Sequence, residues 1–139
     1  MAIKLKHSNT SSTWFITFTC VEWIPLIEMT NTYDMVYKWF DILKNEYKSD
    51  VVAYVIMPNH LHVILHFHSE DFDLNKIIAN GKRFIAYEIV NLLEIARNTT
   101  MLGRLKNLIT EREKIKGQLH KIFKGPLDAK AIFTQPFLL

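Results

Sequence analysis

The amino-acid sequence predicts an α+β domain, in which strands rich in β-branched and aromatic residues alternate with amphipathic helices. Residues 13–21 have the composition and alternation of a strand, and residues 51–57 form a second, apolar strand-like run. Residues 32–48 and 74–96 repeat apolar side chains every three or four positions, as helices with one buried side do. Of the 139 residues, 49% are hydrophobic and 22% are charged, which is typical of a globular protein with its own core.

The first half of the chain is predicted to run as strand, helix, strand, strand. The first strand is broken before Pro25, because proline has no amide hydrogen for a ladder. The helix over residues 32–48 has one apolar stripe. Its members are Met35, Val36, Trp39, Phe40, Leu43 and Tyr47. Pro58 and Asn59 form a turn signal after the second strand, and a third strand is predicted over residues 60–68.

The second half is predicted to be mostly helical. After an acidic connector, a long helix covers residues 74–96, and residues 98–100 interrupt the pattern. The expected buried side of this helix consists of Ile77, Ile78, Phe84, Ile85, Ile89, Leu92 and Leu93. A strongly basic helix follows over residues 102–114, and residues 117–125 read as a short irregular or strand segment. Residues 126–139 show no clear period.

The order β-α-β-β-α is that of a ferredoxin-like antiparallel sheet with helices packed on one face. The sequence contains no internal repeat, low-complexity tract or linker. We therefore expect a single domain over residues 1–139.

Charge is distributed unevenly along the chain. Residues 1–74 hold 5 Lys/Arg against 9 Asp/Glu, whereas residues 75–124 hold 11 against 4, and the whole chain has a net charge of +3. A basic half in a nearly balanced protein indicates one face for a polyanion. The alternative is a set of solvated helices whose lysines keep the protein in solution, and charge alone leaves both interpretations open.

Cys20 is the single cysteine of the chain, so an intramolecular disulfide is excluded and a reducing cytoplasm is favoured. Its place in an apolar strand pattern makes it a core residue rather than a reactive thiol. Apolar runs such as residues 51–57 are too short to cross a bilayer, and the charged N-terminus is not followed by a signal-peptide core. We expect a cytoplasmic protein without a membrane partner.

Four histidines alternate along the third predicted strand, and side chains two apart on a strand share one face. They are His60, His62, His66 and His68. Two imidazoles at this spacing can share one divalent ion, although a further ligand must then come from elsewhere in the fold. An ion with open positions suits the polarisation of a phosphodiester oxygen. The alternative is a polar strand surface, and His66 and His68 could extend the site, bind phosphate or do nothing.

The residues around the histidines carry a family resemblance. Residues 54–64 (Tyr-Val-Ile-Met-Pro-Asn-His-Leu-His-Val-Ile) resemble the signature segment of the insertion-sequence HUH tyrosine transposases, in particular the REP-associated tyrosine transposases. That family's motif reads Met-Pro-Asn/Asp-His-hydrophobic-His on a central strand. Residues 15–19 resemble its first strand, and residues 75–84 resemble the helix after the motif, where a lysine near a phenylalanine is usual.

The resemblance implies a ferredoxin-like homodimer that recognises imperfect hairpins in single-stranded DNA. It implies that His60 and His62, with a third polar ligand, hold Mg²⁺ or Mn²⁺. A tyrosine hydroxyl then attacks the phosphate and leaves a 5′-phosphotyrosine and a free 3′-hydroxyl, which combines nucleophilic catalysis with metal charge stabilisation.

The sequence departs from the family at the nucleophile. In the family the tyrosine lies on a C-terminal helix, with a polar residue four positions later as the third ligand; this chain ends at Leu139 without that element. We therefore expect a domain that lacks the family's C-terminal catalytic helix. Tyr87 and Asn91 reproduce the spacing on the long helix, where residues four apart share a face. The alternative is that Tyr87 only packs. The other tyrosines, which precede the histidines, are weaker candidates.

Basic residues of the second half are candidates for phosphate contact. They are Lys82, Arg83, Arg97, Arg104, Lys106, Arg112, Lys114 and Lys116. Trp14, Trp23 and Trp39 could stack on unpaired bases, but tryptophans in such positions are more often core residues.

The leading hypothesis is a transposase-type protein that binds hairpin-bearing single-stranded DNA and cleaves it with a divalent metal at His60 and His62. One alternative is a catalytically inactive relative that binds the hairpin without forming a covalent adduct. Another is a metal-dependent hydrolase that uses water and is indifferent to the loss of every tyrosine. The last is a metal-free interaction domain, which divalent ions would not stabilise.

Overall fold

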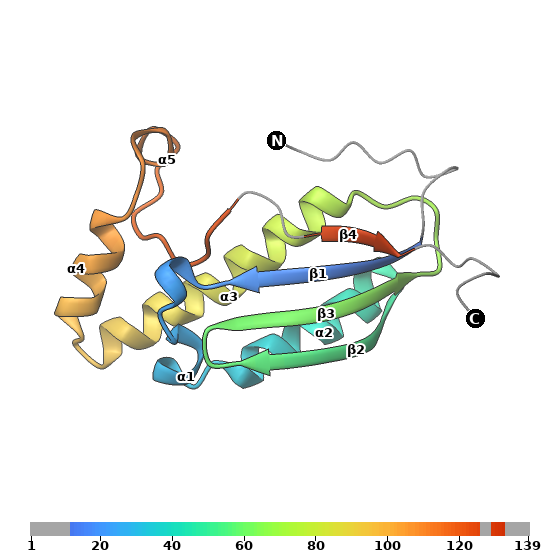
Figure 1. Ribbon diagram of the computed structural model, residues 1–139, viewed down its shortest axis with the longest axis horizontal. Coiled ribbons are helices and arrows are strands. Elements are labelled where there is room, and N and C mark those ends of the chain that lie inside the picture. Colours follow the sequence, from blue (N-terminus) through green and yellow to red (C-terminus); the bar gives the residue numbers. More distant parts are fainter. Residues whose placement is uncertain (1–11, 126–128, 133–139) are drawn as a thin grey trace.

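The computed structural model describes residues 12–125 and 129–132, and Figure 1 shows its arrangement. A four-stranded sheet has the order β2-β3-β1-β4, and each neighbouring pair is antiparallel. The strands are β1 (Thr13–Thr19), β2 (Ser49–Met57), β3 (His60–Phe67) and β4 (Ala129–Ile132). Helices α2 (Tyr33–Tyr47) and α3 (Leu74–Ile95) lie behind the sheet. The α+β, ferredoxin-like fold expected from the order of elements is confirmed.

Alternation in the two central strands decides which face the helices cover. Ile16 and Phe18 of β1 lie opposite Val63 and Leu61 of β3, and all four are buried. They join one continuous core with the apolar stripes of α2 and α3. Burying each such side chain contributes about 1.5–3 kcal/mol, so a one-residue slip that reversed the faces would be costly.

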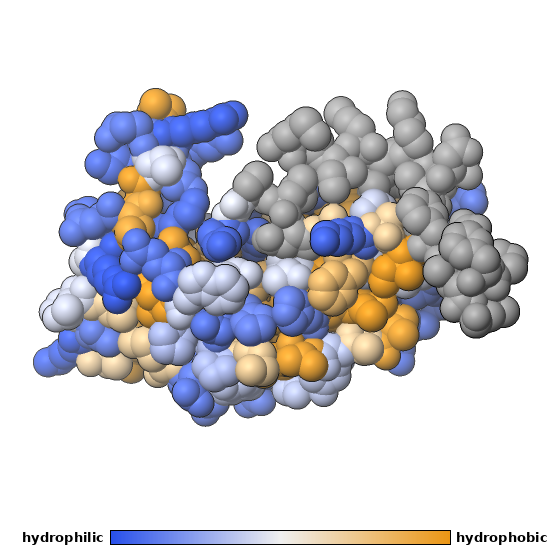
Figure 2. Space-filling model, in the orientation of Figure 1, coloured by the Kyte–Doolittle hydropathy of each residue, from blue (hydrophilic) through white to orange (hydrophobic). Residues whose placement is uncertain are grey.

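The other side of the sheet, called here the open face, carries the alternate residues of the same strands. It consists of Thr13, Phe15 and Thr17 of β1, His60, His62, Ile64 and His66 of β3, and Ala53, Val55 and Met57 of β2. No helix of the described part of the chain packs on this side, which faces the viewer in Figure 1. In Figure 2 the same side mixes hydrophilic and hydrophobic side chains. The four histidines were predicted to share a face, and His60, His62 and His66 do so within β3.

The segment after β1 is more ordered than a simple break. A 3-10 turn occupies Val21–Trp23, and a short helix α1 covers Leu26–Thr30. Pro25 does not prevent this helix, because it stands at the N-cap position, where its missing N–H costs no helical hydrogen bond. The helix ends at Asn31, whose φ of 52° is in the left-handed region that asparagine tolerates.

The single basic helix predicted over residues 102–114 is wrong, because the chain forms two helices there. Helix α4 covers Thr99–Asn107 and begins earlier than expected, since the Asn98 side chain accepts a hydrogen bond from the Met101 amide. Helix α5 covers Glu111–Ile115 and begins at a capping box, in which Thr110 and Glu113 each bond the other's backbone amide.

The C-terminal part agrees with the expectation over residues 117–125 and contains a further strand over residues 129–132. Within residues 117–125, Phe123 forms an isolated bridge with Cys20 and the rest is irregular. Strand β4, four residues long, pairs with β1. It falls within residues 126–139, where the sequence shows no clear period. Four residues are too few to display a strand alternation. In the described part of the chain, no helix combines the length and the apolar character needed to span a membrane.

Candidate functional site

His60 and His62 lie side by side on the open face, at the end of the sheet where β3 begins. Register places His60 between Met57 and Thr19, and His62 between Val55 and Thr17. The centroids of the two imidazole rings are 4.7 Å apart, and both side chains are partly buried. The strand period therefore brings the two imidazoles together on one face, as their spacing predicted.

Each imidazole is anchored through its Nδ1 atom. His62 Nδ1 lies 2.9 Å from Thr17 Oγ1, and His60 Nδ1 lies 2.7 Å from Asn59 Oδ1. Because an amide oxygen only accepts, His60 donates through Nδ1, which leaves Nε2 with its lone pair. No hydrogen bond occupies Nε2 of either ring among the described residues. A ring held at one nitrogen with the other available is the usual setting of a metal-binding histidine.

The surroundings of His62 also favour its metal-binding form. Burial, followed by the charge of His60, lowers the pKa of His62 below its usual value. Phe15 stacks on the His62 ring, with centroids 5.3 Å apart and planes at 19°. A neutral, oriented imidazole is the form that coordinates a divalent cation.

The His60–His62 pair fits as two ligands of a divalent cation, but no third His, Cys, Asp or Glu is grouped with it among the described residues. Within residues 12–125 and 129–132, no group of three His, Cys, Asp or Glu side chains is placed to hold a metal. Asn91, predicted as the third ligand, is on α3, and its amide nitrogen lies 3.3 Å from Glu88 Oε1. Since α3 packs on the covered face, a single chain does not bring Asn91 to the histidines.

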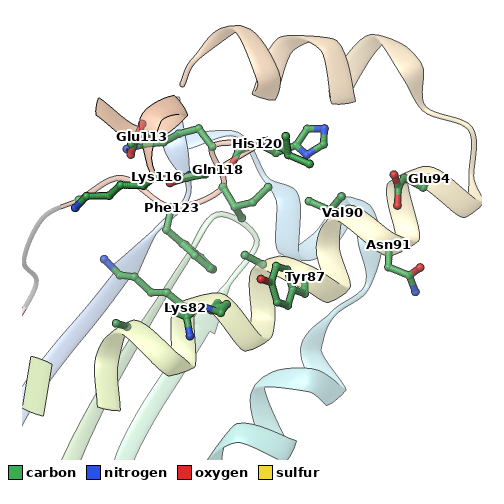
Figure 3. A pocket seen from close by; sticks show the side chains of 18 residues that line it. Lys82, Tyr87, Val90, Asn91, Glu94, Glu113, Lys116, Gln118, His120 and Phe123 are labelled. Atoms are coloured by element: carbon green, nitrogen blue, oxygen red, sulfur yellow. Dashed lines mark hydrogen bonds and ion pairs between the residues drawn. The ribbon is translucent and has the colours of Figure 1, made fainter. Parts of the chain in front are cut away.

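Tyr87, the predicted nucleophile, lies on the same helix and is 70% exposed. It is one helical turn from Asn91, and both line a cavity of about 810 Å³ between α3 and residues 116–125. Figure 3 shows this cavity, with Tyr87 in its wall. Within one chain the sheet separates Tyr87 from His60 and His62.

The cavity is lined by more cations than anions. Four basic residues, Lys82, Arg83, Lys116 and Lys121, stand against Glu94 and Glu113. Lys121 is bonded to Glu113. Three of the predicted DNA-contacting residues, Lys82, Arg83 and Lys116, therefore belong to this cavity.

Arg97, with a φ of 54°, lies between α3 and α4, and the other predicted DNA-contacting residues lie on α4 and α5. They are Arg104, Lys106, Arg112 and Lys114. Arg104 is paired with Glu22 at 3.0 Å, and Lys114 lies 3.7 Å from Glu111. In Figure 2 hydrophilic side chains dominate the part of the surface that α5 forms. Apart from Arg97, the predicted cations thus form two groups, one at the cavity and one on these short helices.

His66 and His68, at the far end of β3, form a pair of different character. Their ring centroids are 4.9 Å apart, and His66 Nδ1 lies 2.8 Å from Thr13 Oγ1. His68 Nε2, however, lies 2.6 Å from Asp50 Oδ2, and this bond lowers the pKa of Asp50. The second pair therefore does not present two open Nε2 atoms.

The three tryptophans separate into two classes. Trp14 and Trp39 are core residues, 5% and 2% exposed, whereas Trp23 is 56% exposed. The Trp23 ring meets His60 edge-on, with centroids 6.1 Å apart, and Lys124 Nζ lies 5.1 Å from the Trp23 ring centroid. The sequence favoured core positions for all three tryptophans, which is wrong for Trp23, and it did not single out Lys124. The available signal was that Trp23 falls between predicted elements, outside any apolar stripe.

Comparison with known proteins gives a likeness at the level of structure. No protein-family model matches the chain, and no curated protein matches its sequence. The structure of a REP-associated tyrosine transposase bound to a REP hairpin is similar, with a TM-score of 0.52 and 17% identity over 99% of this chain. A putative transposase from Deinococcus radiodurans is similar with a TM-score of 0.50 and 11% identity, over 99% of this chain and 89% of its own.

At these low identities the structural likeness shows a shared fold. The chain spans 66% of the length of the REP-associated transposase chain. The resemblance first read from residues 54–64 therefore extends to the architecture of the domain.

Proposed function

We propose that this chain is a transposase-type domain that binds hairpin-bearing single-stranded DNA, with Mg²⁺ or Mn²⁺ at His60 and His62. The observation that carries the proposal is the His60–His62 pair, anchored at both Nδ1 atoms on the open face of a fold shared with transposases. One of those transposase structures holds a REP hairpin. The proposal assigns the same class of ligand to this chain.

The chain's own residues have separate tasks in this function. His60 and His62 offer two Nε2 atoms to the cation, while Thr17 and Asn59 fix the orientation of the rings. The bound cation supplies charge stabilisation at a phosphodiester oxygen. Among the described residues no third His, Cys, Asp or Glu is grouped with the pair, so that oxygen and water would complete the coordination of a bound cation.

The cations at the cavity and on α4 and α5 supply phosphate neutralisation. Lys82 and Arg83 lie on α3 at the cavity, and Lys106 is exposed on α4. Each neutralised phosphate releases condensed counterions, so binding should weaken steeply as salt is raised. These contacts position the DNA and carry no base specificity of their own.

Cleavage requires a nucleophile, and Tyr87 is the candidate on this chain. Its hydroxyl would form a bond to phosphorus and release the 3′-oxygen, leaving a 5′-phosphotyrosine. The position of Tyr87, on the covered side of the sheet, does not favour this step at the His60–His62 pair within one chain. This observation favours a second candidate function, in which the protein binds the hairpin and does not cut it.

Covalent trapping separates the two candidates. The protein and its Tyr87→Phe variant are incubated with Mn²⁺ and a labelled hairpin that has single-stranded flanks, and the products are run on a denaturing gel. An adduct that is lost in Tyr87→Phe establishes cleavage at Tyr87. Retention of the DNA on a native gel without an adduct establishes the binding function alone. Absence of any salt-sensitive retention would contradict both.

A further inference from the structure

The turn that follows β1 is strained at two consecutive residues. Glu22 and Trp23 have φ values of 52° and 58°, in the left-handed region that side chains with a Cβ avoid. For a residue as bulky as tryptophan this conformation is an outlier. Strain of this kind persists where surrounding contacts hold it, and it gathers at binding sites. A compensating gain at Trp23 is therefore expected.

Core packing does not supply that gain, because more than half of the Trp23 side chain is exposed. The turn is instead held through the backbone. The Trp23 amide donates to the Cys20 carbonyl at 3.0 Å, and the Asn59 side-chain amide donates to the Trp23 carbonyl at 3.3 Å. Asn59 is also the residue that anchors His60. Asn59 thus supports both the strained turn and His60. The turn presents the Trp23 indole ring to solvent beside His60.

A cation accompanies the indole. Lys124 Nζ lies 5.1 Å from the Trp23 ring centroid, and the Lys124 amide donates to the Thr19 carbonyl at 2.9 Å, which fixes the lysine backbone against the end of β1. The neighbouring carboxylate, Glu22, is paired with Arg104 at 3.0 Å. The charge next to Trp23 is therefore positive. An exposed aromatic face with a fixed cation is the combination that binds the base and phosphate of single-stranded nucleic acid.

We propose that Trp23 and Lys124 form a nucleotide-binding site in which an unpaired base stacks on the Trp23 indole and Lys124 contacts its phosphate. Because Trp23 touches His60, this nucleotide is the neighbour of the phosphate held at the His60–His62 pair. The proposal rests on the single-stranded DNA binding proposed above and adds two residues that position the strand at the pair. A base inside a duplex is already stacked, so the site selects unpaired DNA.

Tryptophan fluorescence tests the stacking directly, because Trp23 is the one exposed tryptophan of the three and the other two are buried. An unlabelled hairpin oligonucleotide with a single-stranded tail is titrated into the protein while emission is recorded. Affinity is measured in parallel by anisotropy of the same oligonucleotide carrying fluorescein. We expect quenching in the wild type and none in Trp23→Phe, whose affinity remains close to wild type because phenylalanine also stacks.

The affinity measurement uses matched variants. Trp23→Ala should bind the tailed hairpin about tenfold more weakly, as expected for the loss of one stacked base. Lys124→Gln should also bind it more weakly and should reduce the salt dependence. Tyr37→Ala, which removes a 43% exposed aromatic residue from α2, should bind like the wild type. A blunt hairpin without the tail should not distinguish Trp23→Ala from wild type.

A glycine variant separates a DNA-binding role from a structural one. Trp23→Gly relieves the positive φ, so its Tm should equal or exceed that of the wild type while its affinity falls. Wild-type affinity in both Trp23→Ala and Trp23→Gly, without quenching in the wild type, would overturn the Trp23 proposal and leave hairpin binding intact. Failure of the wild type to bind any single-stranded DNA would overturn the proposed function itself.

Discussion

Thr17 is the residue on which the geometry of the candidate site depends most simply. Its hydroxyl holds His62 Nδ1 from the adjacent strand, which keeps Nε2 directed away from the anchor. Thr17→Val keeps the shape of the side chain and removes this bond. Mn²⁺ affinity, measured by calorimetric titration, should fall about tenfold, as is usual when the hydrogen-bond partner of a ligating histidine is lost.

The matched control lies four residues away on the same pair of strands. Thr13 faces His66 across β1 and β3 as Thr17 faces His62. Thr13→Val should therefore leave Mn²⁺ affinity unchanged. Equal losses in both variants would mean that the substitutions act on the sheet and not on the metal site.

Cys20 provides a test of burial at the level of one thiol. Burial raises the pKa of Cys20 to about 11, outweighing hydrogen bonds from the backbone of Leu26 and Ile27. The thiolate is the reactive species, so the native protein at pH 8 should not react with Ellman's reagent. Reaction should appear only on unfolding in guanidinium. A fast stoichiometric reaction in the native state would contradict the placement of Cys20 in the core.

Single residues also show which parts of the candidate site could be predicted from the sequence. The His60–His62 pair was predictable because a strand period fixes which side chains share a face. The spacing of Tyr87 and Asn91 placed them near each other on one helix, but a helical period cannot say which face of the sheet the helix covers. The exposure of Trp23 follows from a left-handed turn, for which neither Glu22 nor Trp23 gives a sequence signal.

Among the elements, α2 and α3 are joined at a close approach that only glycine permits. A Cβ on Gly81 would lie 2.5 Å from Trp39 Cε2, in the middle of the core. Gly81→Ala should destabilise the protein by about 1–3 kcal/mol through overpacking, despite alanine's better helix propensity. Chemical denaturation measures the change.

Gly103 on α4 is the control for that substitution. Nothing lies within 4 Å of a Cβ added at this position. Gly103→Ala should therefore stabilise the protein by about 0.5–1 kcal/mol, the usual gain from replacing glycine within a helix. A loss of stability in Gly103→Ala as large as that in Gly81→Ala would refute the packing argument.

Helix α5 is tied to the chain by Glu113, which bonds Lys121 and the Thr110 amide. Burial alone would raise the pKa of Glu113, but the bonds to Lys121 and Thr110 and the charge of Lys121 together lower it. A lowered folded-state pKa contributes stability above the ordinary glutamate pKa of about 4.3, and this stability is lost as the pH falls through the folded value.

The Glu113→Gln variant keeps the capping geometry and removes the charge. It should be less stable than wild type by about 1 kcal/mol at pH 7, a value typical of a partly exposed ion pair. The difference should shrink toward zero at pH 3, as measured by urea denaturation at each pH. A difference independent of pH would show that the Glu113 charge does not contribute.

Elements were predictable where several turns repeat a pattern. Helix α2 and the long helix α3 each present an apolar stripe over many residues, and their predicted bounds lie within one or two residues of the observed ones. The start of a separate helix α5 had a sequence signal, because Thr110 and Glu113 have the spacing of a capping box. Strand β4 had no such signal, because its partner β1 and not its own composition makes it a strand.

At the scale of the whole molecule, the fold shows where the basic and acidic stretches of the sequence lie. The basic stretch over residues 75–124 forms α3, α4, α5 and the segment that ends at Lys124. The histidine pair belongs to the acidic stretch before it. The two meet at the end of β1, where Lys124 lies over the Trp23 ring and Trp23 touches His60. The sequence predicted both halves, but only the fold shows where they adjoin.

The measurement that tests the central claim most directly is Mn²⁺ binding, followed by the loss of the free-ion signal in electron paramagnetic resonance. We predict one site per chain in the wild type, its loss in the His60→Ala, His62→Ala double variant, and its retention in the His66→Ala, His68→Ala double variant, because Asp50 occupies His68 Nε2. Full Mn²⁺ binding without His60 and His62, or loss of binding in the other double variant alone, would contradict the account.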